Sequence, residues 1–226
     1  MNRILLLFAI LTAISINSFG QQWTECKVDS TLTITIPDNF EITDTLGQRV
    51  ITSQVDNGLI LVSALENKGK TAVNVQNENE LIDFYTGFQK GAINSQKGEL
   101  IKEEIIEING LKFLRFSLKP TMEDEKQIRH CLAVFAANKT YSIYFWELES
   151  MTDEMTPIRE RLFSSVKLPS SLTAKDQMSY SPEGSRSYDI GYLVGEIFGY
   201  VIIFGLIIIL VVWISKSVRK KSAKVQ

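Results

Sequence analysis

The stretch "EEIIEINGLKFLRFSL", residues 103–118, decides the fold of this chain. Asn109-Gly110 separates two apolar-rich runs, and this dipeptide in that position is the strongest short signal of a β-hairpin. In the second run, apolar residues such as Leu114 and Phe116 recur at every second position, so they line one face of a strand. The stretch therefore predicts two antiparallel strands with a buried face.

Similar patterns extend to both sides of this hairpin. Residues 31–37, 58–65 and 71–75 are short apolar runs between turn-forming residues and are expected to be strands. Apolar residues at helical spacing predict an amphipathic helix over 79–95. Residues 128–149 form a second hairpin whose return arm has aromatic side chains on both faces, which is typical of a central strand.

A closing helix is expected to begin near Ser150 or Thr152 and to end before Pro169. Its buried stripe contains Ile158 and Leu162. The order of strands, helix, four strands and helix predicts an α+β fold. This fold is a mainly antiparallel sheet with two packed helices, an α/β sandwich.

The N-terminus has the form of a secretory signal peptide over residues 1–20. Arg3 precedes an apolar core at 4–16, and small residues lie just before Gln21. The alternative is an uncleaved anchor, but the apolar run is shorter than the roughly 20 residues that cross a bilayer. We therefore expect residues 21–168 to be an exported domain, extracytoplasmic and, in a bacterium, periplasmic.

A second apolar run, residues 190–214, is long enough to span a membrane and carries one charge, Glu196. The preceding residues 169–189 lack periodicity and are rich in serine, so they are expected to form a flexible tether. The tail 215–226 is basic, which favours a cytoplasmic location. The expected anchors at the membrane interface are Tyr192, Trp213, Lys216, Arg219, Lys220 and Lys221.

Three glycines in this run recur at every fourth position and make a smooth ridge on one helix face. A parallel stripe of polar side chains lies beside the ridge. The predicted helix-packing face consists of Gly191, Gly195, Gly199, Tyr192, Glu196 and Tyr200. It predicts self-association or packing on a partner helix, and the alternative is that the glycines are simply tolerated in an ordinary anchor.

The chain has two cysteines, Cys26 and Cys131. An oxidising compartment would permit a disulfide between them, and two separate buried thiols are the alternative. His130 is the only histidine and neighbours Cys131 on a predicted strand, so the two side chains point to opposite faces. A satisfied or solvent-facing histidine is expected.

The sequence carries few signs of chemistry. Ser164 and Lys167 match a Ser-x-x-Lys pattern at a frequency that chance explains, and Asn138 begins a glycosylation sequon on a predicted turn. Two acidic groups are read as solvated surface: Glu103, Glu104 and Glu107, and then Glu123, Asp124 and Glu125. No catalytic residue, cofactor or metal is predicted. Acidic residues outnumber basic ones between 21 and 189, which argues against nucleic acid as a partner.

Several segments resemble the PsbP-like superfamily, which includes DcrB-type periplasmic domains. They are "TITIPDNFEIT" (33–43), "INGLKFLRFSL" (108–118), "YSIYFWE" (141–147) and "RERLFSSVKLP" (159–169), and the likeness covers most of residues 30–168. The resemblance implies an α+β fold far more than an activity, since members mostly serve as binding or assembly modules.

Three functions are compatible with these features. The first is a membrane-tethered, non-catalytic domain that binds another envelope protein. The second is a small-molecule or lipid-binding domain, with an apolar pocket between helix 79–95 and the sheet rimmed by Tyr85 or Trp146. The third is an enzyme whose titratable groups converge only in the fold.

Overall fold

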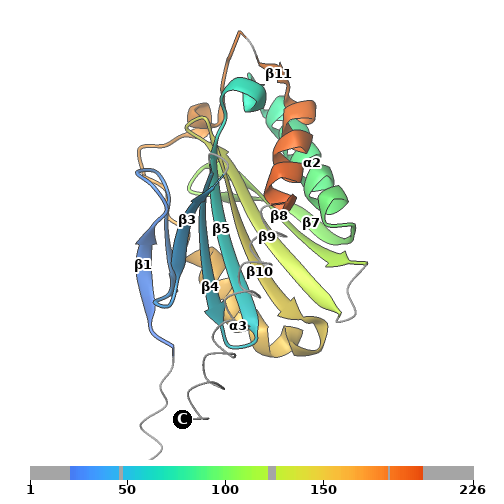
Figure 1. The fold of residues 1–226 in the computed structure, drawn as a ribbon. Coiled ribbons are helices and arrows are strands. Elements are labelled where there is room, and N and C mark those ends of the chain that lie inside the picture. Colours follow the sequence, from blue (N-terminus) through green and yellow to red (C-terminus); the bar gives the residue numbers. More distant parts are fainter. Residues whose placement is uncertain (1–20, 46–47, 122–125, 183, 201–226) are drawn as a thin grey trace, which may run out of the picture.

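A computed structural model describes residues 21–45, 48–121, 126–182 and 184–200. Its centre is a seven-stranded antiparallel sheet (Figure 1). In spatial order the strands are β3 (Glu41–Thr45), β4 (Gln48–Val55), β5 (Gly58–Glu66), β10 (Lys139–Leu148), β9 (Gln127–Ala136), β8 (Leu111–Pro120) and β7 (Gly98–Ile108). β10 lies in the middle, as its aromatic residues on both faces predicted.

The two predicted hairpins are confirmed. β7 and β8 meet at Asn109 and Gly110, whose φ angles of 52° and 77° are those of the tight turns that match the twist of a hairpin. β9 and β10 turn at Ala137 and Asn138, both with positive φ, one residue earlier than expected.

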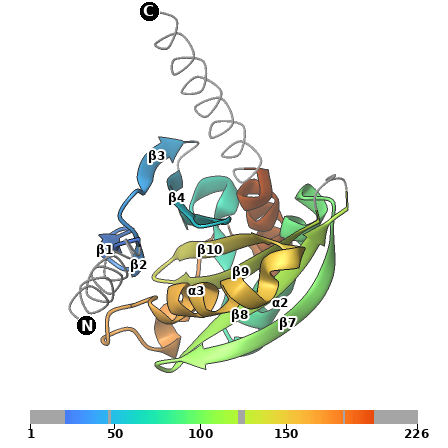
Figure 2. The same cartoon turned by 90° about the horizontal axis from the view of Figure 1, so that it is seen from below.

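Each face of the sheet carries its own apolar core. Along β10, Tyr144 and Trp146 belong to one core, and Ile143 and Phe145 belong to the other. α2 (Glu78–Ser95) and a helix over residues 187–200 cover the first face. α3 (Thr152–Ser164) and the hairpin of β1 (Trp23–Lys27) and β2 (Thr33–Pro37) cover the second face. Figure 2 shows α3 and the helix 187–200 on opposite sides of the sheet.

α2 begins where the sequence predicts. The side chain of Asn77 accepts a hydrogen bond from the backbone nitrogen of Glu80 at 3.1 Å and caps the helix. The carboxylate of Glu80 accepts in turn from the backbone nitrogen of Gln76 at 2.7 Å. The helix then buries Leu81 and Phe88 against the sheet.

The third helix corrects the expectation of two packed helices. Ile190, Val194 and Phe198 recur every fourth position of residues 187–200 and are buried in the first core. The first eleven residues of the predicted span therefore belong to the α/β domain. Within the part of the chain that the structure describes, no helix is long and apolar enough to cross a membrane. Residues 201–214 lie outside that part.

The expected flexible tether, residues 169–189, also needs correction. A short helix, η3 (Ala174–Gln177), lies on β8 and β9, and β11 (Ser185–Arg186) pairs in parallel with β6 (Val73–Asn74). We call residues 174–186 the strap. It binds the domain through long-range contacts, which its irregular sequence does not reveal.

Three strands were not predicted, namely β1, β3 and β4. The predicted strand over 71–75 is also reduced to the two residues of β6 after a short helix, η1 (Gly69–Thr71). These strands have weak apolar alternation because several of their residues are polar or exposed.

Candidate functional site

Backbone contact joins α2 to the helix 187–200. A Cβ atom placed on Gly191 or Gly195 would come well within 3.0 Å of a backbone carbonyl oxygen, that of Phe84 or Phe88. Real Cβ atoms essentially never come so close to another atom, and a backbone carbonyl cannot swing aside as a side chain can. A Cβ on Gly199 would instead collide with a side chain, that of Ser95. The ridge therefore allows the two helices to touch through their backbones.

The contact is reciprocal, because α2 has a ridge of its own. A Cβ on Gly87 or Gly91 would collide with the carbonyl oxygen of Tyr188 or Tyr192. Gly87, Gly91 and Ser95 follow the same four-residue spacing as the C-terminal glycines, a signal that the sequence analysis missed. We call the six small residues of the two helices the glycine seam.

The glycine seam changes the interpretation of the C-terminal ridge. Its glycines face a helix of the same chain, so they are not free to receive another chain. Beside the seam, Asn94 donates to Glu196 at 3.2 Å, while the Tyr200 side chain is half exposed. Of the two predicted roles of this face, self-association and packing on a partner helix, the structure has the second, and the helix is α2 of the same chain.

The strap is locked by one buried side chain, Gln177. Its amide nitrogen donates to the carbonyl oxygens of Lys112 and Phe135 at 2.8 and 3.0 Å, and its side-chain oxygen accepts from the nitrogen of Lys112 at 2.8 Å. The hydroxyl of Tyr85 donates to the same Lys112 oxygen at 2.7 Å and accepts from the nitrogen of Phe135 at 3.0 Å. Burial raises the pKa of Tyr85, so its hydroxyl keeps the proton that it donates.

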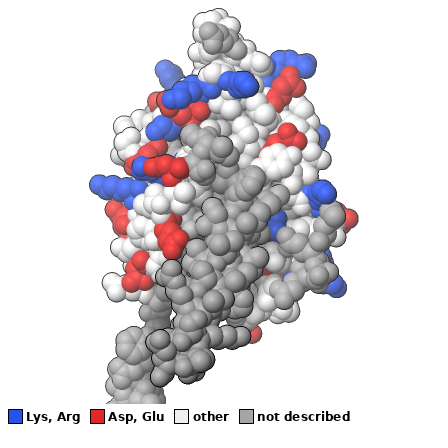
Figure 3. Space-filling model, in the orientation of Figure 1, with Lys and Arg blue, Asp and Glu red and all other residues white. Residues whose placement is uncertain are grey.

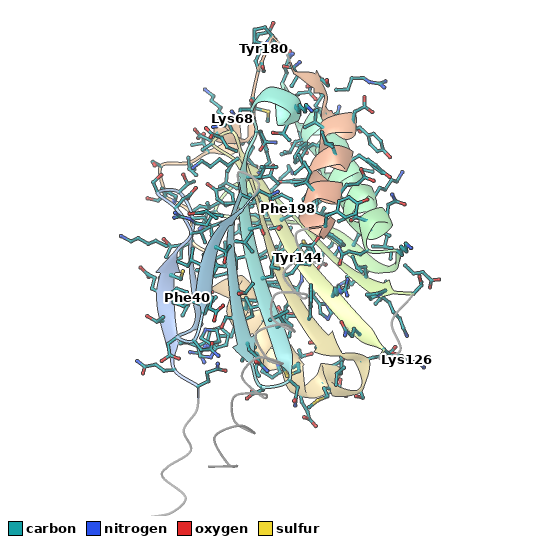
Figure 4. The ribbon with its side chains drawn as sticks, viewed as in Figure 1. Phe40, Lys68, Lys126, Tyr144, Tyr180 and Phe198 are labelled. Atoms are coloured by element: carbon teal, nitrogen blue, oxygen red, sulfur yellow. The ribbon has the colours of Figure 1, made fainter. Side chains whose placement is uncertain are left out.

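An aromatic series links the glycine seam to the sheet. Phe198 packs on Phe88 with ring centroids 5.7 Å apart, and Phe88 packs on Phe116 at 6.4 Å. Phe116 in turn meets Tyr144 at 6.4 Å. Figure 4 shows Phe198 and Tyr144, the two ends of this series, over the same face of the sheet.

His130 takes part in a buried polar network on the opposite face. The hydroxyl of Ser117 lies 2.7 Å from its Nδ1, and Oε1 of Glu147 lies 3.1 Å from its Nε2. Arg159 of α3 donates to that Glu147 oxygen at 2.8 Å and to the hydroxyl of Thr156 at 2.9 Å. The expectation of a satisfied histidine is confirmed.

Serine, histidine and carboxylate also form the catalytic triad of many hydrolases, but the network here differs from that triad in which ring nitrogen each partner contacts. In that triad, the hydroxyl bonds Nε2 of the histidine and the acid bonds Nδ1. Here the two partners are exchanged. Nη1 of Arg159 also lies 3.1 Å from Nε2 of His130, so a cation occupies the acid end of the network. We interpret the network as a clamp that joins three strands to α3.

The predicted disulfide is absent, and both thiols are free and buried. Cys26 lies in the core under α3, whereas Cys131 lies in the core under α2, so the sheet separates them. Burial raises the pKa of both thiols. The alternative of two separate buried thiols is the one that the structure has.

The remaining candidates take structural roles. Among the residues described, no group of three or more His, Cys, Asp or Glu side chains could hold a metal ion. Glu104 pairs with Lys102 at 3.3 Å, and Glu103 accepts from Gln89. The hydroxyl of Ser164 donates to a backbone carbonyl of its own helix.

The sequon is held by hydrogen bonds. Asn138 donates from its side chain to the carbonyl oxygen of Asn67 at 3.1 Å. The Thr140 hydroxyl is buried and donates to the Asn67 side chain at 2.9 Å. Both polar residues of the sequon therefore fasten the β9–β10 turn.

The space between α2 and the sheet, where the small-molecule or lipid-binding alternative requires a pocket, is filled. Phe84, Phe88 and Phe116 are buried there, and the hydroxyl of Tyr85 is bonded to the backbone of Lys112 and Phe135. Trp146 is not an open rim either, since the guanidinium of Arg129 lies 4.6 Å from its ring centre. These contacts remove the main support for a small-molecule or lipid site at this position.

Charge does not single out a site on the face that carries the glycine seam. Figure 3 shows basic and acidic side chains intermixed among the described residues of that face. The signal peptide, Trp213, the acidic group at 123–125 and the basic residues of the tail lie outside the described residues.

The fold defines a class. A long antiparallel sheet with α2 on one face and α3 on the other is the α/β sandwich of PsbP-like proteins, as the sequence resemblance implied. The solution structure of cyanobacterial PsbP (CyanoP) from Synechocystis has this fold, with a TM-score of 0.50 and 13% identity over 68% of this chain and 96% of that chain. At this identity the likeness shows the fold alone.

Two further solved structures are similar at lower scores. The Ran-binding protein Mog1p of Saccharomyces cerevisiae matches 70% of this chain and 100% of its own, at 12% identity and a TM-score of 0.43. LpqN of Mycobacterium tuberculosis, described as involved in cell envelope biogenesis, matches 66% of this chain and 91% of its own, at 10% identity and a TM-score of 0.40. No model of a known family and no curated protein sequence matches the chain.

Proposed function

We propose that this chain is a single-pass membrane protein whose extracytoplasmic domain is a non-catalytic protein-interaction or assembly module of the cell envelope. The glycine seam is the observation that carries the proposal. It makes residues 187–200 part of the domain core, so the apolar sequence that follows leaves the domain from a fixed point. An anchor of this kind holds the domain in one orientation toward its partners.

The position of the proposed span follows from the same contact. Phe198 is buried in the domain and Gly199 packs on Ser95, so the proposed span would begin near Tyr200 and include the apolar run that ends at Ile214. Trp213 would lie near its inner end, and Lys216 would extend its ammonium group to the headgroups. Tyr192 lies at the α2 contact and is not an interface anchor in this arrangement.

A non-catalytic role is supported by the structural contacts of the side chains that could take part in catalysis. His130 and Glu147 are committed to Arg159, and the thiols lie inside the two cores. In this proposal the domain binds a partner through its surface, and its anchor sets the orientation of that surface.

Proximity cross-linking in cells, followed by mass spectrometry, tests the proposal. The full chain at native expression is compared with a chain that ends at Tyr200, which keeps every described element and lacks residues 201–226. We expect the full chain in the membrane fraction, cross-linked to a specific envelope protein, and the shortened chain released from the membrane. Recovery of the full chain as a freely soluble protein without any specific cross-link would contradict the proposal.

A further inference from the structure

β7 is an edge strand of the seven-stranded sheet. β7 pairs with β8 on one side, and no strand among the described residues pairs with its other side. It is 11 residues long, and the side chains of Leu100, Ile101 and Ile105 are 43%, 52% and 40% exposed. Half of the large hydrophobic side chains that are exposed in the described part of the chain thus lie on this one strand.

A long edge strand with exposed apolar side chains is a template for another strand, and proteins usually protect such edges. The protection here is partial. The register between β7 and β8 shifts between Leu100 and Lys102, which marks a bulge at Ile101. Beyond the bulge, residues 102–108 pair with β8 in unbroken register, so their outer edge is regular.

The side chains of β7 as a whole have a defined chemistry. Four of the β7 residues are glutamates, and the strand has one lysine. On the face toward α2, Leu100, Glu103, Ile105 and Glu107 give an apolar–acidic alternation, since their β8 partners share that face. A strand added here would meet apolar and acidic side chains in turn.

We propose that β7 is a docking strand for an extended segment of a partner protein in which basic and apolar residues match this order. This inference rests on the proposed function and specifies the partner. Such a segment would add backbone hydrogen bonds to residues 102–108 and place lysine or arginine opposite the glutamates.

A second copy of this chain fits the edge poorly in the register centred on Ile105. Antiparallel pairing of two β7 strands about Ile105 would place Glu103 of one copy opposite Glu107 of the other. Like charges directly opposite each other on neighbouring strands are destabilising. The acidic edge therefore favours a basic partner over self-pairing.

A designed peptide provides the test. The peptide Val-Lys-Val-Val-Lys-Lys-Thr, paired antiparallel to residues 108–102, puts lysine opposite each glutamate and valine opposite each isoleucine. Binding to the full chain in detergent micelles is measured by fluorescence anisotropy, and hydrogen exchange of residues 98–108 is followed by mass spectrometry. The control peptide has proline in place of the second of the two adjacent valines, which cannot complete the ladder.

We expect the first peptide to bind and to slow exchange in β7, and the proline peptide to do neither. Glu107→Lys should weaken binding at least about fivefold, because it replaces an attraction by a repulsion. The matched control is Asp83→Lys, at an exposed position of α2. It makes the same change in net charge and should leave the affinity for the peptide within about twofold.

Three results would overturn the docking strand. They are unchanged exchange in β7 at saturating peptide, equal weakening by Glu107→Lys and Asp83→Lys, and a dimer of the free chain that protects β7. A specific envelope cross-link that maps away from β7 would reject this inference while leaving the proposed function intact.

Discussion

The amide nitrogen of Gln177 lies 3.3 Å from the hydroxyl oxygen of Tyr85, and together these side chains replace a missing part of the sheet. The β8–β9 ladder is registered from Leu118–Arg129 to Leu114–Ala133. Its continuation would pair Lys112 with Phe135, but there the backbone groups bond to the two side chains. A helix and the strap thus complete a strand pair.

We predict that Tyr85→Phe and Gln177→Ala each lower the free energy of unfolding by about 1–3 kcal/mol. Each leaves buried backbone groups of Lys112 or Phe135 without a partner. Because the two side chains share these groups, the double variant should deviate from additivity by at least about 0.5 kcal/mol. Chemical denaturation of the four proteins measures this, with exposed Lys175→Ala as the control; strict additivity would mean that the side chains act independently.

Gly195→Ala should destabilise the domain, although alanine is the better helix former by about 1 kcal/mol. The added methyl group meets the Phe88 carbonyl, and forcing the helices apart costs about 1–3 kcal/mol. Glu196→Ala, one residue further along, removes surface interactions with Asn94 and Tyr192 and should change stability by less than about 0.5 kcal/mol. Thermal unfolding of both variants in micelles gives the comparison, and a stabilised Gly195→Ala protein would disprove the close contact.

Asp29 makes the fold sensitive to acid. Burial opposes its ionisation, but hydrogen bonds from Lys139, from the backbone of Leu32 and Thr31, and from Tyr141 outweigh it and lower the pKa of its carboxyl below 3.8. A lowered folded-state pKa contributes stability above the unfolded value, and this contribution is lost as the pH falls below about 4. Asp29→Asn should therefore be less stable than the parent at pH 7, with a difference that shrinks toward pH 3. Denaturation across this range tests it, and a difference independent of pH would exclude the carboxylate as the cause.

The clamp under α3 contains a buried ion pair between Glu147 and Arg159. Glu147→Ala should cost up to about 3–5 kcal/mol, since it removes the buried anion of the guanidinium and leaves only the half-exposed carboxylate of Glu160, 3.6 Å away. The double variant Glu147→Leu and Arg159→Met should recover much of this loss, because it leaves no unpaired charge. The urea midpoints of the parent, the single variant and the double variant test this. A double variant as unstable as Glu147→Ala would show that packing, and not charge, holds α3.

Neither cysteine should react in the folded protein. Both thiols are buried with raised pKa values, so little thiolate is present and reagents cannot reach it. Iodoacetamide under native conditions should leave Cys26 and Cys131 unmodified, and both should become labelled in denaturant without reductant. A Cys26–Cys131 peptide in the unreduced digest would contradict the separation by the sheet.

The sequence alone determined the elements whose pattern is local. Asn109-Gly110 specifies its turn because both residues tolerate positive φ, and the periodicity of 79–95 specifies an amphipathic helix. The aromatic residues of β10 placed it at the centre because two buried faces need apolar side chains on both sides. The antiparallel sheet follows from these features, and the PsbP-like fold was implied by the resemblance of the segments quoted above.

Only the tertiary structure decided which group of the chain each of these surfaces contacts. The glycine ridge at 191–199 predicts close packing against another helix, but the spacing does not specify whether that helix belongs to another chain or to this one. The strap has no periodicity, and Gln177 is an ordinary polar residue until the splayed ends of β8 and β9 surround it. A ridge or a side-chain amide specifies what kind of contact it can make, whereas the path of the chain specifies which group comes within reach.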